Sequence, residues 1–295
     1  MIFLTPHTFV FSVLYGMMLF VIFSVQDFFM FWVVIELSTL VFIGISYSCF
    51  KNHFSRLLMF FVIQAVSAFM LLIFFIKQST FMFTLSFLIK MAMFPYHFWY
   101  FSLVPFFPNF VLIFSMTLFK IPSVYILRAF FNLLDLKLLF MSSLITVLVG
   151  GSIMIFSNDL RFILIGSSVA NNSWFVLSQM TRTFIFLTFF VLYSWFVLVV
   201  FSVLDSLISY SSKNTSISAR VSMILGLIVL SGIPPFPIFF VKMFIVLFMA
   251  ANLNYSFFVL ILMILNILVL LGYLKYIFNH ILSFYGNLNS FILFS

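Results

Sequence analysis

Four ionisable side chains interrupt long apolar stretches of this sequence: Glu36, Lys90, Lys120 and Lys242. A Lys or Glu in the middle of a membrane costs about 2.5–3.5 kcal/mol on insertion scales. We therefore expect each of them to face the protein interior, to meet polar partners or water, and to serve a purpose. Amino and carboxyl groups held in this way can take up and release protons inside a membrane.

Glu36 is the only glutamate in the chain and lies well inside the apolar run 28–50, beside Ser38 and Thr39. The alternative is a structural carboxylate that pins two helices together. A neutral Gln would do that at a lower cost, because no charge would have to leave water. The sequence therefore favours a functional role for Glu36.

For the three lysines, the alternative to a functional role is snorkelling, in which the apolar stem stays in lipid and the ammonium group reaches a nearby interface. Lys90 is followed by Pro95, which has no N–H, so the carbonyl of Met91 loses its helical partner. Freed carbonyls at membrane depth are tolerated where they line a cavity or meet polar groups. Lys120 is likewise followed by Pro122, and Lys242 lies inside the apolar run 236–249.

Other polar groups at helical spacing leave two interpretations open. His97 could be a relay group that titrates near neutral pH, or a polar anchor in an aromatic belt with Trp99 and Tyr100. Gln64 and Ser67 could carry water between charged sites, or form the hydrogen bonds that hold helices together.

The composition indicates that lipid is the solvent. Of 295 residues, 66% are apolar and 6% are charged, against about 45–50% and 25% in soluble domains. The net charge of +8 is spread singly along the chain, which fits membrane topology and not nucleic-acid binding. A single cysteine, Cys49, excludes a disulfide within the chain or a metal–thiolate site.

Spanning the hydrocarbon requires about 20 apolar residues in a helix, and the sequence predicts one all-α transmembrane domain over residues 1–295. Its ten helices are expected near 6–25, 28–50, 56–76, 80–104, 108–130, 138–156, 160–180, 183–208, 219–249 and 254–278, followed by a short tail at 279–295. Two are expected to be discontinuous. The span 80–104 holds Lys90 and Pro95, and the span 219–249 holds Gly232, three prolines and Lys242. Paired interrupted helices indicate an ion site in transporters.

Two features predict an organellar origin. Residues 1–25 contain no Lys or Arg, so we expect no import signal. Phe occurs 50 times, which suggests a T-rich coding genome.

Several segments, in order along the chain, resemble one family. Residues 90–99, Lys-Met-Ala-Met-Phe-Pro-Tyr-His-Phe-Trp, are similar to the Lys-x-x-x-x-Pro-[Phe/Tyr]-His-Phe-Trp segment of the NADH:ubiquinone oxidoreductase chain 2 family, an antiporter-like membrane subunit of respiratory complex I. Further matches are Glu36-Leu37-Ser38, Lys120-Ile121-Pro122, Gly150-Gly151 with Leu160-Arg161 and Ser167-Ser168 through Trp174, and Ser231-Gly232-Ile233-Pro234-Pro235-Phe236 through Lys242. Together they cover roughly residues 28–245.

The resemblance implies an antiporter-like bundle in a subunit of NADH:ubiquinone reductase that helps to move protons across the mitochondrial inner membrane. The family's Glu–Lys pair, central lysine and terminal ionisable group would be Glu36 with Lys90, then Lys120, then Lys242. We expect the Glu36–Lys90 pair to shift the pKa of Lys120, which then passes its proton toward Lys242. His97 is a weaker candidate for proton transfer.

The resemblance also implies partners. We expect other membrane-arm subunits of complex I on both sides, a surrounding bilayer including cardiolipin, and no nucleic acid. NADH, FMN, the iron–sulfur clusters and ubiquinone would be bound by other subunits of the complex, and no cofactor by this chain.

Two positions depart from the family pattern. Phe162 stands where a Lys usually follows Leu-Arg, and Asn171 or Asn172 stands where a His is usual. A relay at that point would depend on water or amides. The alternatives are a stand-alone Mrp-type cation/proton antiporter subunit and a purely structural membrane-arm subunit.

Overall fold

The computed structural model describes residues 6–25, 27–49, 54–181, 183–209, 217–234, 236–250 and 253–292. Within these ranges all regular structure is helical, and no strand occurs. The predicted all-α class is thereby confirmed. The chain, which the sequence predicts as one transmembrane domain, groups into two compact units, residues 1–146 and 147–295, which are described separately.

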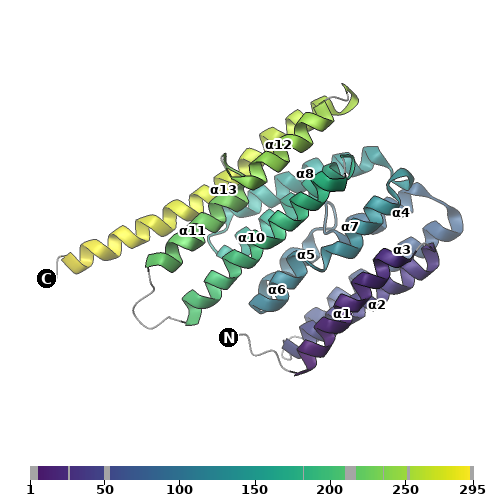
Figure 1. Ribbon diagram of the computed structural model, residues 1–295, viewed down its shortest axis with the longest axis horizontal. Helices are drawn as coiled ribbons and strands as arrows, with labels where there is room; N and C mark the ends of the chain where they lie inside the picture. Colours follow the sequence, from purple (N-terminus) through teal and green to yellow (C-terminus); the bar gives the residue numbers. More distant parts are fainter. Residues whose placement is uncertain are drawn as a thin grey trace. The chain divides into compact units, whose positions relative to one another are not determined.

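The first unit is a bundle of long and short helices. It contains α1 (Pro6–Ser24), α2 (Phe28–Cys49), α3 (Phe54–Lys77), α4 (Thr80–Lys90), α5 (Phe98–Leu103), α6 (Asn109–Met116) and α7 (Lys120–Ala129), with 3-10 turns η2 (Val104–Phe106) and η3 (Phe131–Leu133). The three long helices lie side by side in chain order (Figure 1), and α4 contacts both α3 and α7. The α4–α7 contact brings the surroundings of Lys90 to the helix that begins with Lys120.

The second unit is built around α9. Its helices are α9 (Leu160–Gln179), α10 (Thr183–Ser209), α11 (Ile217–Ser231), α12 (Pro237–Ala250) and α13 (Leu253–Ile292), and α8 (Leu136–Phe156) crosses the boundary between the units. α9 packs against α10, α12 and α13 and is buried at every position from Ile163 to Gln179. The segment expected as a tail, 279–295, is helical as far as Ile292, and its last three residues lie outside the described ranges.

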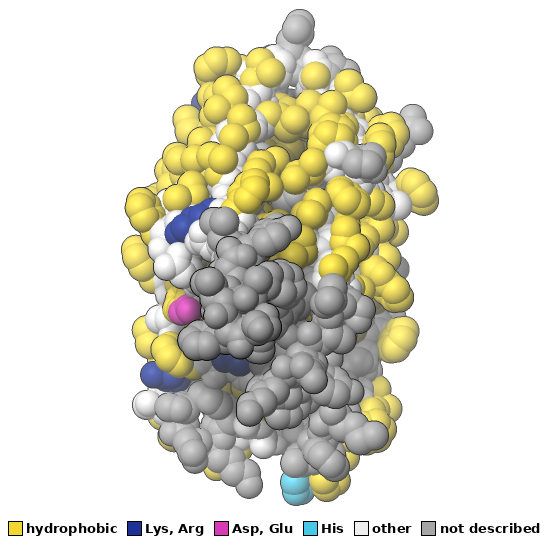
Figure 2. All heavy atoms as spheres, turned by 90° about the vertical axis from the view of Figure 1, so that its left-hand side faces the viewer, with side chains coloured by type: hydrophobic (Ala, Val, Ile, Leu, Met, Phe, Trp, Pro, Cys, Tyr) yellow, Lys and Arg dark blue, Asp and Glu magenta, His cyan; other side chains and the backbone are white. Residues whose placement is uncertain are grey.

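The outer surface of these helices suits lipid. In the described part of the chain, seven helical segments are long and apolar enough to cross a membrane: α1, α2, α3, α6 with α7, α8, α10 and α13. α9 is not among them, and its buried serines and asparagines make it less apolar. The face in Figure 2 is covered mainly by hydrophobic side chains wherever it is described. Large apolar residues such as Phe20, Phe69 and Phe257 project outward.

Three pairs of short helices are separated by interruptions. The expected breaks are present between α4 and α5 and between α11 and α12, although Pro235 of the second break lies outside the described residues. A third interruption separates α6 from α7 inside the span expected at 108–130. Pro122 explains it, because a proline clashes with the carbonyl four residues earlier, here that of Leu118. The Tyr15 hydroxyl donates to this carbonyl at 3.2 Å.

Glycines bring α8, α9 and α13 into close contact in the second unit. A β-carbon built on Gly150 would lie 2.6 Å from the carbonyl oxygen of Gly166, and one on Gly272 would lie 2.5 Å from the Cβ of Met154. Small residues at helix contacts are typical of membrane bundles, where close backbone packing replaces the hydrophobic drive.

Candidate functional site

Glu36 of α2 and Lys90 of α4 form an ion pair in the first unit. The Lys90 Nζ lies 3.4 Å from the Glu36 Oε1, and the two side chains are 4% and 22% exposed, respectively. The best charge-assisted hydrogen bonds are shorter, about 2.7–2.9 Å. The pair is therefore formed, at a longer distance than the strongest charge-assisted hydrogen bonds.

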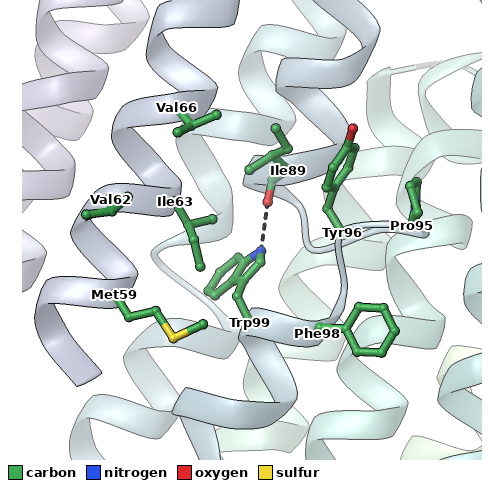
Figure 3. A pocket seen from close by; sticks show the side chains of 9 residues that line it. All are labelled: Met59, Val62, Ile63, Val66, Ile89, Pro95, Tyr96, Phe98 and Trp99. Carbon is green, nitrogen blue, oxygen red and sulfur yellow. Dashed lines mark hydrogen bonds between the residues drawn. The ribbon is translucent and has the colours of Figure 1, made fainter. Parts of the chain in front are cut away.

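The interruption after α4 fixes the position of Lys90, which is the last residue of that helix. Ala92 turns the chain with a left-handed φ of 53°, a conformation that costs a residue with a side chain about 1–2 kcal/mol. The Trp99 indole then donates to the carbonyl of Ile89 at 3.1 Å (Figure 3), which ties α5 back to the end of α4. A cation at the end of α4 is also favoured by the helix dipole.

The pocket in Figure 3 is apolar. It has a volume of about 300 Å³ and is lined by Met59, Val62, Ile63, Val66, Ile89, Pro95, Tyr96, Phe98 and Trp99. Its lining contains none of the four charged candidates. Ile89 faces this pocket, whereas the next residue, Lys90, lines a separate cavity with serine, threonine and glutamine side chains. The last two residues of α4 therefore face different cavities, and polar side chains line only the one at Lys90.

Lys120 lies at the interruption between α6 and α7, as the first residue of α7. It is 4% exposed, and its Nζ is 5.8 Å from the centre of the Tyr100 ring. A cation this close to an aromatic face is stabilised by the ring quadrupole. The Ser123 hydroxyl lies 2.8 Å from the Lys120 carbonyl oxygen and 2.9 Å from the Met91 sulfur, next to the α4 break. Lys120 is thus held inside the first unit.

Lys242 of α12 has a site of its own in the second unit. It is 3% exposed, and its Nζ donates to the Asn266 Oδ1 at 3.4 Å. The Trp174 indole donates to the same oxygen, also at 3.4 Å, and the Nζ lies 5.1 Å from the centre of the Trp174 ring. Gly232 lies beside the lysine in a left-handed conformation with φ 73°.

All three buried lysines therefore lie at or beside helix interruptions. Lys90 ends a helix, Lys120 begins one, and Lys242 reaches back to Gly232 in a break. A snorkelling lysine would keep its ammonium group at the surface, and these side chains are buried. Glu36 and Lys90 are in contact, Lys120 lies elsewhere in the same unit, and Lys242 belongs to the second unit.

His97 lies outside these contacts. Its ring is buried and packs among Phe94, Phe98 and Phe101 at centroid distances of 5.9, 4.2 and 6.0 Å. Trp99 and Tyr100, which could form an aromatic belt with it, are buried as well. A role for His97 in proton transfer stays a prediction. Among the residues described, no group of three His, Cys, Asp or Glu side chains could hold a metal ion.

Sequence reasoning missed two neighbours of the lysines, Asn266 beside Lys242 and Tyr100 beside Lys120. Asn266 is the only Asn or Gln in the apolar stretch 255–278, and this is the signal that could have marked it as the acceptor for Lys242. The sequence suggests only an interfacial anchor role for Tyr100, and no pattern in it connects Tyr100 to Lys120. The Lys120 contact joins residues beside two helix breaks, whereas the Lys242 contact arises from the packing of α12 against α13.

The fold and these sites define a class: a multi-pass membrane protein whose interrupted helices hold ionisable side chains in its interior. No family model and no curated protein sequence matches the chain. Solved structures of two membrane complexes are among those that share this fold. A chain of respiratory complex I from Thermus thermophilus with bound aureothin is similar with a TM-score of 0.78 and 16% identity, over 92% of this chain and 69% of that one. A chain of the Mrp complex from Dietzia sp. DQ12-45-1b is similar with a TM-score of 0.70 and 18% identity, over 85% of this chain and 56% of that one.

Proposed function

We propose that this chain is an antiporter-like subunit of the membrane arm of respiratory complex I. The observation that carries the proposal is the Glu36–Lys90 ion pair at a helix interruption, because it joins two residues that the sequence resemblance assigns to one proton-transfer unit. The shared fold with a chain of complex I supports it. More specifically, we assign the chain to NADH:ubiquinone oxidoreductase chain 2 of the mitochondrial inner membrane, on the strength of the sequence motifs and the phenylalanine bias.

In the proposed mechanism, opening and closing of the Glu36–Lys90 pair changes the electric field at Lys120. An opposite charge within about 4–6 Å changes a pKa by about 1–3 units, and each unit corresponds to about 1.4 kcal/mol. Such a change is large enough to load or unload a lysine. Lys242, held by Asn266 and Trp174, is a further proton-carrying group in the second unit.

The energy for this cycle would come from other subunits of the complex. We propose that they bind NADH, FMN, the iron–sulfur clusters and ubiquinone, and that this chain contributes to NADH:ubiquinone reductase only by moving protons. Its partners are then the neighbouring membrane-arm subunits on both sides and the surrounding lipids, including cardiolipin.

The Lys120→Met variant tests the proposed function in the assembled complex. We expect NADH-driven proton pumping to be lost while assembly survives, because Met fills the same buried space without a proton-carrying group. The matched control is Lys77→Met, which changes an exposed lysine at the end of α3 and should leave pumping unchanged. Normal pumping by an assembled Lys120→Met complex would reject the mechanism.

A stand-alone Mrp-type antiporter subunit is the second candidate, favoured by the structural similarity to a chain of the Mrp complex. Co-purification with hydrophilic redox subunits and a quinone-linked activity would decide for complex I. A purely structural subunit is the third candidate. In that case neutralising Glu36 or Lys120 would impair assembly and leave the pumping of the assembled fraction unchanged.

A further inference from the structure

Gln64 of α3 is a buried amide whose polar atoms have no protein partner. It is 1% exposed, and among the described residues no group hydrogen-bonds to its side-chain Oε1 or Nε2. The Ser67 hydroxyl, one turn away, donates to the backbone carbonyl of Gln64 and not to its amide. Buried polar groups without any partner are rare, and each requires an explanation. An apolar side chain would be the less costly choice if packing were its only role.

The Gln64 side chain lines a small cavity between α2, α3, α4 and α7, in which polar side chains face apolar ones. Lys90 lines it from α4, Thr39 from α2 and Ser123 from α7. The cavity has a volume of about 10 Å³. A single water molecule requires a cavity of about 10–15 Å³. The space therefore fits one water molecule and no larger ligand.

The groups around the cavity match the hydrogen-bonding needs of water, which takes two to four polar partners in a protein interior. The Lys90 ammonium has three donors and directs one of them to Glu36. Gln64 offers a carbonyl oxygen as acceptor and an NH₂ group as donor. The hydroxyls of Thr39 and Ser123 donate to carbonyls of their own helices, those of Glu36 and Lys120, which leaves their oxygens able to accept.

We propose that this cavity is a binding site for one water molecule, which the Gln64 amide holds against the Lys90 ammonium. The water would hydrate Lys90 both when it is paired with Glu36 and when the pair opens. Gln64 is then a positioning residue that acts on Lys90 through the water. The functional consequence, easier separation of the ion pair during pumping, rests on the proposed function, whereas the presence of the water does not.

A cryo-electron microscopy map of the assembled complex tests the water directly. We expect a density peak about 2.7–3.2 Å from both the Gln64 amide and the Lys90 Nζ. No variant is needed for this measurement, so a folding defect cannot obscure it. An empty cavity in a map that shows other buried waters would overturn the proposal.

Variants then test the positioning role. Gln64→Met keeps a flexible side chain of similar size and removes both polar groups, so the water density should disappear. Because a hydrogen bond to a charged group contributes about 1.5–3 kcal/mol, the rate of proton pumping should fall by about tenfold. The control is Ser67→Ala, which removes a buried hydroxyl from the same helix but does not line the cavity. It should keep both the density and normal pumping.

The outcomes separate this inference from the proposed function. If Lys120→Met pumps normally, the proposed function fails, while density at Gln64 would still support the water site. If Lys120→Met stops pumping and Gln64→Met pumps normally, the positioning role of Gln64 is wrong and the proposed function stands. If Gln64→Met does not assemble, the map of the unmodified complex decides.

Discussion

Replacing Asn266 by Asp would place a carboxylate beside Lys242 with almost no change in shape. The acceptor oxygen lies 3.4 Å from the Lys242 Nζ. At that separation and an effective dielectric constant of about 20, two unit charges attract by about 5 kcal/mol. Desolvation of the new carboxylate offsets part of this attraction. Enough of the attraction should remain to keep Lys242 in its ammonium form and paired with the new Asp.

We therefore expect the Asn266→Asp complex to assemble but to pump protons at least about tenfold more slowly, since 1.4 kcal/mol of extra retention already corresponds to a factor of ten. The assay is proton uptake and release by complexes reconstituted in lipid vesicles, normalised to the rate of NADH oxidation. This normalisation separates a pumping defect from a general loss of activity.

The matched control is Asn266→Leu, which removes the acceptor without adding a charge. It deletes the long hydrogen bonds that the Lys242 ammonium and the Trp174 indole donate to Asn266. A hydrogen bond to a charged group contributes about 1.5–3 kcal/mol, and at 3.4 Å the lower end applies, so the effect should be smaller than that of Asp. Normal pumping by an assembled Asn266→Asp complex, or a larger defect in Asn266→Leu, would refute a proton-carrying role for Lys242.

Two further predictions concern the backbone. Ala92→Val should lower the free energy of unfolding by at least about 1–2 kcal/mol, because a β-branched residue at φ 53° is more strained than alanine. Ala92→Gly should fold at least as stably as the native chain, because glycine adopts this conformation without strain. Thermal unfolding in detergent measures both variants, and equal melting temperatures for Val and Gly would contradict the prediction. Gly150→Ala should cost about 1–3 kcal/mol, since its Cβ would lie 2.6 Å from the Gly166 carbonyl oxygen. Gly16→Ala is the control, since nothing lies within 4 Å of the added carbon, and an equal loss in both variants would show that the close contact is not the cause.

The sequence by itself determined the fold class, because hydropathy and helix length are local properties. The expected span 28–50 corresponds to α2 at Phe28–Cys49, and the span 138–156 to α8 at Leu136–Phe156. Pro95 and Gly232 marked two interruptions for an equally local reason, the geometry of proline and glycine. Pro122 carried the same information about the break before α7.

The partner of each buried charge was decided by the tertiary structure. The resemblance had suggested that Glu36 and Lys90 form a pair, but 54 positions separate them, and only the packing of α2 near α4 shows that their side chains meet. Lys242 contacts Asn266 and Trp174, which lie 24 and 68 positions away in the sequence, and only helix packing shows these contacts. In the same way, only the packing of four helices shows that Gln64 lines a cavity. Helical periodicity determines which residues share one face of a helix, whereas the neighbouring helix that covers that face depends on how the interrupted segments pack together.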